Sequence, residues 1–205
     1  MKLYWSSRSP YVRKVMVAAH ETGVAGRIAC VRTIVSAAKP NVEMMPDNPL
    51  AKLPTLVLDD GRALYDSRVI CEYFDTLHKG ARLHPAAGAE RITALRRQAL
   101  ADGLLDTLVG WMGERTRPAE LQSTPHMDGY RLKLKSALKQ LESEADALAR
   151  DPFGIGHIAI GTALSYADFR FGPENWRAGH PGLANWHEGF AARPSVKATE
   201  HADVY

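Results

Sequence analysis

Residues 51–70 read AKLPTLVLDDGRALYDSRVI and contain two short apolar runs, a tight turn and the start of a helical pattern. The runs at 54–59 and 62–65 predict strands, because short apolar segments bounded by turn residues are typical of a small sheet. Asp60-Gly61 between them is a strong hairpin signal, so the two strands are expected to be antiparallel neighbours. The apolar spacing over 67–77 then predicts a helix.

The residues before this stretch complete a small sheet. Residues 2–5 and 28–35 predict two more strands, and 11–22 carry apolar residues at helical spacing. Pro10 stands where the first turn of a helix tolerates proline. The order βαβ followed by ββα predicts a small α/β domain in which helices cover a sheet.

After residue 79 the pattern becomes helical throughout. The stretch 80–88 is rich in Gly, His, Pro and Ala and predicts a linker, while 89–115, 129–150 and 155–171 all show helical periodicity. We therefore expect one domain over 1–79 and an all-helical domain over 89–205. The last of these segments is almost uncharged, which is typical of a helix surrounded by others.

Composition limits the function classes. The chain has 205 residues, 45% of them hydrophobic, and 26 Lys and Arg against 23 Asp and Glu, an excess too small to indicate nucleic-acid binding. Cys30 and Cys71 lack metal-site spacing, so no metal is expected, and both predict buried, reduced thiols. No apolar run approaches the ~18 residues of a membrane span and no signal peptide opens the chain. A cytoplasmic protein is expected, with no membrane or nucleic-acid partner.

Residues 6–9, SSRS, form a polar turn between the first predicted strand and the first predicted helix. The N–H groups at a helix N-terminus are unpaired and the helix dipole is positive there, so an anion is favoured. One of the three serines is expected to contact that anion. The pattern leaves Ser6, Ser7 and Ser9 open, and Ser9 also fits the role of a plain helix N-cap.

Two further points in the first domain combine with this turn. Pro54 begins a strand and leaves the backbone of Leu53 free to bond a ligand, and Asp66-Ser67 begins a helix, where Ser67 fits an N-cap. Taken singly, each has an ordinary structural explanation. Together they suit a small peptide that carries a free α-amino group and a carboxylate.

Three segments carry a resemblance to a known family: SPYVRKV (9–15), NPLAKLPTLVLDDGRALYDSRVICEYFD (48–75) and WRAGHPGLANWHEGFAARPS (176–195). Together they resemble a bacterial glutathione S-transferase. The resemblance covers nearly the whole chain and implies a thioredoxin-like N-terminal domain followed by an all-α domain. It also implies that glutathione is the co-substrate.

The resemblance assigns roles to individual residues. It implies that Ser9 is catalytic and donates a hydrogen bond to the glutathione sulfur. Relatives with cysteine at this position carry out thiol transfer, so serine favours conjugation to an electrophile. The residues implied to bind glutathione are Ser9, Lys52, Leu53, Pro54, Asp66 and Ser67.

The electrophile is expected between the two domains, against a wall that includes Tyr11, Trp111 and Arg115. For Trp111, a position in the ordinary core between helices is given equal weight. Nothing in the sequence names the electrophile or the physiological reaction. The alternative function is a glutathione-transferase-like protein-interaction module without catalysis, because fold alone does not imply activity.

The resemblance further implies a symmetric homodimer. Several charges on the long helix from residue 89 are compatible with a two-fold interface, and solvent exposure explains each equally well. They are Arg91, Arg96, Arg97, Asp102 and Asp106.

Family members usually carry a capping box at the start of the helix predicted over 155–171. Here Gly154 and His157 occupy its positions, which predicts that the box is absent. The similar letters SYAD at 165–168 are expected to lie in mid-helix.

Overall fold

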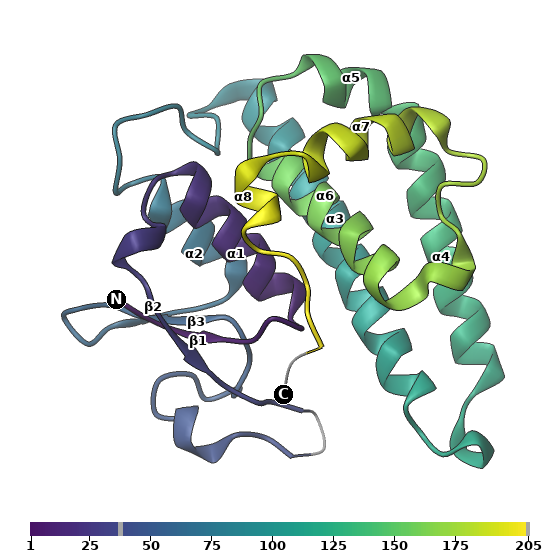
Figure 1. The fold of residues 1–205 in the computed structure, drawn as a ribbon, viewed down its shortest axis with the longest axis horizontal. Helices are drawn as coiled ribbons and strands as arrows, with labels where there is room; N and C mark the ends of the chain where they lie inside the picture. The colour runs from purple at the N-terminus through teal and green to yellow at the C-terminus, as the bar shows by residue number, and fades with distance from the viewer. Residues whose placement is uncertain (37–38, 204–205) are drawn as a thin grey trace. The chain divides into compact units, whose positions relative to one another are not determined.

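In the computed structural model, which describes residues 1–36 and 39–203, the chain divides into two units (Figure 1). The first contains residues 1–86 together with the segment that begins at Pro194, and the second contains residues 87–193. The sequence predicted that the segment from Pro194 onward belongs to the helical domain, whereas the structure assigns it to the first unit. Its assignment to the first unit follows from hydrogen bonds such as that from Arg13 Nη2 to the Val196 carbonyl, 3.4 Å.

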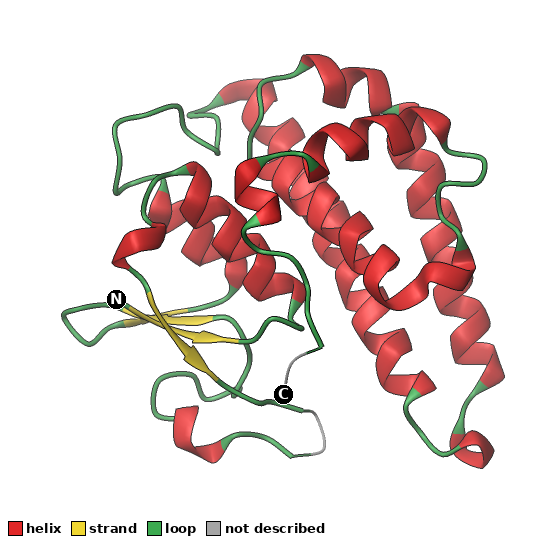
Figure 2. Cartoon of the chain, viewed as in Figure 1, coloured by secondary structure: helices red, strands yellow, loops and turns green. Residues whose placement is uncertain are grey.

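The first unit is built on a mixed four-stranded sheet in the order β2-β1-β3-β4 (Figure 2). β1 pairs in parallel with β2 and antiparallel with β3, and β3 pairs antiparallel with β4. The strands are β1 (Lys2–Trp5), β2 (Ala29–Arg32), β3 (Thr55–Val57) and β4 (Ala63–Leu64). The predicted hairpin and the predicted succession βαβ then ββα along the chain are confirmed, although the strands are shorter than the apolar runs.

The turn between β3 and β4 shows why the sequence marks it so clearly. Gly61 has φ of +86°, a left-handed conformation that glycine adopts without a steric penalty. The Leu58 amide donates to the Arg62 carbonyl across the turn at 2.8 Å. Asp60 Oδ1 accepts from the Arg62 amide at 3.0 Å, so the local sequence supplies every contact the turn needs.

Three helices pack in the first unit. α1 and α2 lie on the same face of the sheet, and α8 packs against α1 (Figure 1). Their bounds are α1 (Pro10–Glu21), α2 (Ser67–Phe74) and α8 (Pro194–Lys197). Leu3 and Leu56 from the sheet and Phe74 from α2 are fully buried, so the core of this unit is apolar.

The second unit is all-helical. Its α-helices are α3 (Gly88–Arg115), α4 (Thr124–Ser143), α5 (Ala145–Arg150), α6 (Ile155–Phe171) and α7 (Pro181–Ala191). The single helix predicted over 129–150 is two helices, because Glu144 (φ −103°, ψ 0°) ends α4 and caps α5. Short 3₁₀ turns, η1 (Ala25–Arg27), η2 (Val42–Met44), η3 (Ala119–Leu121) and η4 (Gly172–Glu174), occur in the two units.

The predicted core helix is α6, in which most residues are buried. Its start corrects one expectation. Gly154 has no side chain to complete a capping box, but the Gly154 amide donates to His157 Nδ1 at 3.1 Å, so half of the box is present. Burial lowers the pKa of His157, which therefore stays neutral and accepts this bond. The SYAD letters lie inside α6, as predicted.

A charged network ties α3 to the α4–α5 junction. Glu144 Oε2 accepts from Arg96 Nη2 at 2.7 Å and from Arg97 Nε at 2.9 Å, and Arg97 Nη1 contacts Asp151 Oδ2 at 2.6 Å. Arg96 and Arg97, two of the charges compatible with a subunit interface, therefore have partners inside their own unit. They add nothing to the case for a dimer.

The expectation of two buried thiols is correct only for Cys71. Cys30 is exposed because β2 is an edge strand whose four residues are all exposed. Edge strands lack a neighbour on one side, which a short apolar run does not reveal.

Candidate functional site

The start of α1 holds the predicted catalytic serine. Ser9 is the N-cap of α1, and its Oγ accepts from the Val12 amide at 3.3 Å, with Pro10 as the first helical residue. An N-cap hydroxyl uses only its oxygen in this bond. No acceptor for the Ser9 hydroxyl proton is present among the residues the structure describes, so that proton is available to a ligand. Ser9 is thus both the N-cap and a free donor.

The other two serines of the turn have different surroundings. Ser7 Oγ donates its proton to the Ala202 carbonyl at 2.9 Å, and Ser6 Oγ accepts from the Arg8 amide at 3.3 Å. The Ser7 proton is therefore already committed. Among the serines left open by the sequence, Ser9 and Ser6 keep a hydroxyl proton for a ligand, and only Ser9 lies at the helix N-terminus.

The loop before β3 is organised by Asn48, which is 2% exposed. Its Nδ2 donates to the Lys52 carbonyl at 3.3 Å and to Thr55 Oγ1 at 2.8 Å, while its Oδ1 accepts from the Leu50 amide at 3.0 Å. In the sequence, Asn48 is only one residue of a loop rich in proline and other turn residues. Its role at the centre of a hydrogen-bond network depends on Lys52 and Thr55, which lie outside the turn.

The next feature of the site is the backbone of Leu53, which lies between Lys52 and Thr55 of this network in the chain. The Leu53–Pro54 peptide bond is cis, and Pro54 is buried next to the start of β3. Within the described part of the chain, the N–H and C=O groups of Leu53 make no hydrogen bond. Because backbone groups are normally paired, these two are candidates for ligand contacts. The Lys52 side chain is exposed.

Asp66 lies at the start of α2 and is the N-cap, so the prediction that Ser67 has this role is wrong. Asp66 Oδ1 accepts from the Arg68 amide at 2.9 Å, and its Oδ2 pairs with Arg68 Nη2 at 2.9 Å. Partial burial acts to raise the pKa of Asp66, but the Arg68 hydrogen bonds and the charge of the fully buried Lys14 outweigh it and leave the pKa lowered. A carboxylate is therefore present here at neutral pH.

Ser67 is the first residue of α2 and is 3% exposed. Its hydroxyl makes no hydrogen bond with any residue in 1–36 or 39–203. Ser67 Oγ is not one of the fully buried side-chain atoms without a partner, so it is accessible to a ligand, and the N-terminus of a helix favours a negatively charged one. Ser67 is therefore the clearest position for a ligand carboxylate in this unit.

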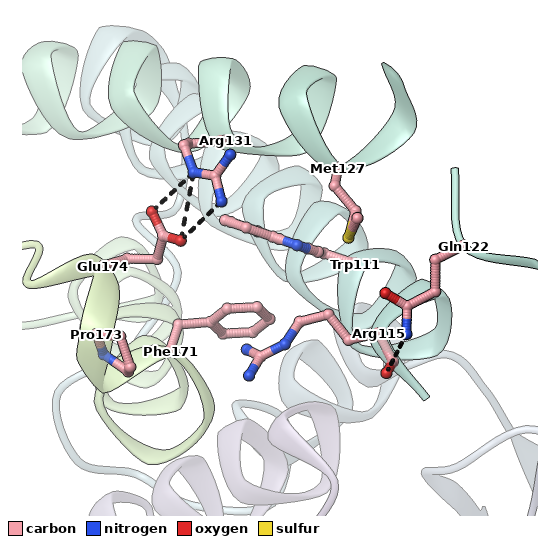
Figure 3. Close-up of a pocket in the computed structure, with 8 residues that line it drawn as sticks. All are labelled: Trp111, Arg115, Gln122, Met127, Arg131, Phe171, Pro173 and Glu174. Atoms are coloured by element: carbon pink, nitrogen blue, oxygen red, sulfur yellow. Dashed lines mark hydrogen bonds and ion pairs between the residues drawn. The ribbon is translucent and has the colours of Figure 1, made fainter. Parts of the chain in front are cut away.

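The second unit contains a pocket of about 340 Å³ (Figure 3). Its residues come from α3, α4, the end of α6 and the adjoining turns. They are Trp111, Arg115, Gln122, Met127, Arg131, Phe171, Pro173 and Glu174.

Two arginines of the pocket differ in their partners. Arg131 pairs with Glu174 at 3.1 Å and with Asp128 at 3.0 Å, whereas Arg115 Nη1 donates to the Arg170 carbonyl at 3.2 Å. Arg115 has no acidic partner among the described residues. Arg115 is therefore the positive charge that remains uncompensated in this pocket.

Two of the three residues predicted to contact the electrophile meet in this pocket. Trp111 is 2% exposed and packs on Phe171 with ring centroids 4.8 Å apart, which favours its interpretation as interhelical core. Arg115 is exposed beside it (Figure 3). Tyr11 belongs to α1 in the first unit, and its part in the same wall stays a prediction.

No cluster of three or more His, Cys, Asp or Glu residues in 1–36 and 39–203 is placed to hold a metal ion. None of the helices in this part of the chain has the length and apolar character needed to cross a membrane.

The small mixed sheet with two helix N-termini, followed by a helical unit, defines a thioredoxin-like domain joined to an all-α domain. Residues 8–77 match the family described as glutathione S-transferase, N-terminal domain, and 124–189 match glutathione S-transferase, C-terminal domain. The chain belongs to the glutathione S-transferase family, which confirms the resemblance and the predicted fold.

Individual relatives are similar to this chain over almost its full length. An uncharacterised GST-like protein of Escherichia coli K12, YibF, is 31% identical over 98% of both chains. A crystal structure of a glutathione transferase family member from Pseudomonas fluorescens, with bound glutathione, is 42% identical with a TM-score of 0.95 over 98% of both chains. One from Methylobacillus flagellatus with GSH bound is 34% identical with a TM-score of 0.87, covering 98% of this chain and 99% of that one.

Proposed function

We propose that this protein is a glutathione transferase that activates glutathione as a thiolate and adds it to a small electrophile. The observation that carries the proposal is that Ser67, a residue 3% exposed at the N-terminus of α2, has a hydroxyl without a hydrogen bond to any described residue. The available proton of Ser9 and the unbonded backbone of Leu53 support it. So do two relatives whose structures hold glutathione.

The residues have separate roles in binding. The ionised Asp66 binds the γ-glutamyl amine, and Ser67 with the free amides of α2 binds the γ-glutamyl carboxylate. The Leu53 backbone, placed by Pro54, pairs with the cysteinyl backbone. Lys52 contacts the glycyl carboxylate.

Ser9 acts on the reacting atom. Its hydroxyl donates to the sulfur, and this bond and the positive N-terminus of α1 both favour the thiolate over the thiol. A free thiol has a pKa of about 8.5, so stabilising the anion raises its fraction at neutral pH. The sulfur then forms a bond to the electrophilic carbon, and a leaving group departs or the adduct gains a proton. Arg115 in the second unit and Tyr11 of α1 are candidates for contacting the electrophile.

The experiment that tests this function measures glutathione binding to the purified protein by calorimetry, together with the thiolate absorbance of the bound peptide. Binding below millimolar concentration with a thiolate signal at pH 7 is expected. Absence of binding at millimolar glutathione would favour a protein-interaction module instead.

Asp66→Asn should weaken glutathione binding without slowing catalysis at saturation. Asn caps a helix as well as Asp, so the variant removes the charge and keeps α2 intact. We expect KM for glutathione to rise about three- to tenfold with kcat unchanged, since the group contacts the part of the ligand that does not react. Steady-state kinetics checks this, and Ser67→Ala should behave alike.

The matched control is Asp60→Asn. Asp60 pairs with Arg62 two residues later at 2.7 Å, the same arrangement as Asp66 with Arg68, but in the hairpin turn. It should leave KM unchanged. An equal loss of kcat at saturating glutathione for the Asp66, Ser67 and Ser9 variants would contradict the division between binding and catalysis.

We also propose a symmetric homodimer, which rests on the family resemblance, and a cytoplasmic location, which stays a prediction from the sequence. Sedimentation at micromolar concentration should then give about twice the 22.6 kDa chain mass. A monomer that still turns over substrate would overturn this.

A further inference from the structure

The last part of the chain is held against α1 of its own unit. We call residues 194–203 the C-terminal segment; it begins with α8. Ser195 Oγ donates to Glu21 at the end of α1, and Arg13 Nη2 donates to the Val196 carbonyl at 3.4 Å. Val196 is 1% exposed. The beginning of the C-terminal segment is therefore an anchored part of the first unit.

The end of the same segment contacts the turn that precedes Ser9. Ser7 and Ala202 exchange two hydrogen bonds, from Ser7 Oγ to the Ala202 carbonyl at 2.9 Å and from the Ala202 amide to the Ser7 carbonyl at 3.4 Å. His201 Nδ1 donates to the same Ser7 carbonyl at 3.1 Å. Ser7 is thus bonded on both its backbone and its side chain.

The next residue of the turn is held as well. Arg8 Nε pairs with Asp203 Oδ1 at 3.1 Å, with both side chains partly exposed. An exposed ion pair is worth little by itself, so the Ser7 contacts matter more. Residues 201–203 therefore hold both residues between Ser6 and Ser9.

The turn has few hydrogen bonds of its own. The Ser9 amide donates to the Ser6 carbonyl at 3.2 Å, and the Arg8 amide donates to Ser6 Oγ at 3.3 Å. A hydrogen bond to a reacting atom loses strength steeply with distance and angle. Small movements of this turn would therefore change the bond from Ser9 to the sulfur more than they would change glutathione binding elsewhere.

We propose that residues 201–203 of the C-terminal segment are positioning residues for Ser9. They fix the Ser6–Ser9 turn so that the Ser9 hydroxyl and the first amides of α1 meet the glutathione sulfur, and they occupy the Ser7 hydroxyl so that it does not compete. The catalytic role of residues 201–203 rests on the proposed function. Their stabilisation of the Ser6–Ser9 turn is independent of that function.

The test compares the wild-type protein with a variant that ends at Glu200 and with Ser7→Ala. Both changes should lower kcat about three- to tenfold and raise the pKa of bound glutathione's thiol, with less than about a twofold change in glutathione affinity. Combining them should give little further loss, because both remove the same contact. If the truncated chain fails to fold, Ser7→Ala carries the test.

Ser195→Ala is the matched control, since it removes a hydrogen bond of the same segment to the far end of α1. It should leave the thiol pKa unchanged even if it lowers thermal stability. A truncated protein with wild-type kcat and wild-type thiol pKa would overturn the proposal while leaving the proposed function intact.

Hydrogen exchange supplies a readout that does not depend on catalysis. In the protein without glutathione, the hydrogen-bonded amides of Arg8 and Ser9 should exchange faster in the truncated variant and in Ser7→Ala, but not in Ser195→Ala. Unchanged exchange in this turn would overturn the proposal even if the protein proved not to bind glutathione.

Discussion

Ser9→Ala should lower kcat at saturating glutathione about tenfold to a hundredfold and change the affinity for glutathione far less. The hydroxyl makes one charge-assisted hydrogen bond to the sulfur, worth about 1.5–3 kcal/mol, and the bond is stronger to the thiolate than to the thiol. The same variant should raise the pKa of the bound thiol toward that of free glutathione. Measuring kcat and thiolate absorbance against pH checks both expectations.

Ser9 is also the N-cap of α1, so Ser9→Ala removes about 1 kcal/mol of stability for a reason unrelated to catalysis. Ser9→Gly separates the two effects, because glycine at an N-cap costs only a few tenths of that. The Gly variant should lose as much kcat as the Ala variant, whereas Ser9→Thr, which keeps a hydroxyl, should retain most of it.

Ser6→Ala serves as the matched control within the turn. Ser6 Oγ accepts from the Arg8 amide within the turn but lies outside the helix cap, so this variant should lower kcat no more than Ser7→Ala does and far less than Ser9→Ala does. If Ser6→Ala disables the enzyme while Ser9→Ala has no effect, the catalytic serine has been assigned wrongly.

Glu144→Gln should lower the free energy of unfolding of the helical unit by about 2–3 kcal/mol at pH 7. Glu144 accepts from Arg96, Arg97 and Gln140. Partial burial alone would raise its pKa, but these hydrogen bonds lower it from 4.5 to about 2. The Glu144 side chain is 12% exposed and that of Arg97 is 6% exposed, so water weakens the pair less than it weakens a surface pair.

The sign of the pH dependence follows from the lowered pKa. A carboxyl group that is more acidic in the folded protein stabilises the fold above its unfolded pKa and loses that effect as it is protonated. The difference between the wild-type protein and Glu144→Gln should therefore be full above pH 4.5 and shrink as the pH falls toward about 2. Urea unfolding at several pH values, followed by tryptophan fluorescence, measures it, since three of the four tryptophans lie in the helical unit.

Asp128→Asn is the control for this experiment. Asp128 pairs with Arg131 on an exposed surface, where an ion pair contributes about 0–1 kcal/mol. It should shift the unfolding midpoint little at any pH. A Glu144→Gln difference that stays constant from pH 7 to pH 3 would show that the carboxylate charge does not stabilise the unit.

Much of the fold was readable because its signals act over short distances along the chain. The Asp60-Gly61 turn makes its hydrogen bonds within a few residues, and the apolar spacing of 155–171 requires only that one segment be surrounded. Three separated motifs were enough to indicate the family and the candidate residues Ser9 and Ser67. Each of these features depends on local geometry or on residue order, which a sequence contains in full.

Only the tertiary structure shows which residues far apart in the chain are in contact. Ser7 meets Ala202 across 195 positions, and Glu144 meets Arg97 across 47. Side-chain pairings of this kind leave no periodic pattern, because one polar residue at each end looks like any other surface position. The sequence by itself determined that a serine turn begins the first helix, and only the folded chain determined which serine keeps a free proton at the helix N-terminus.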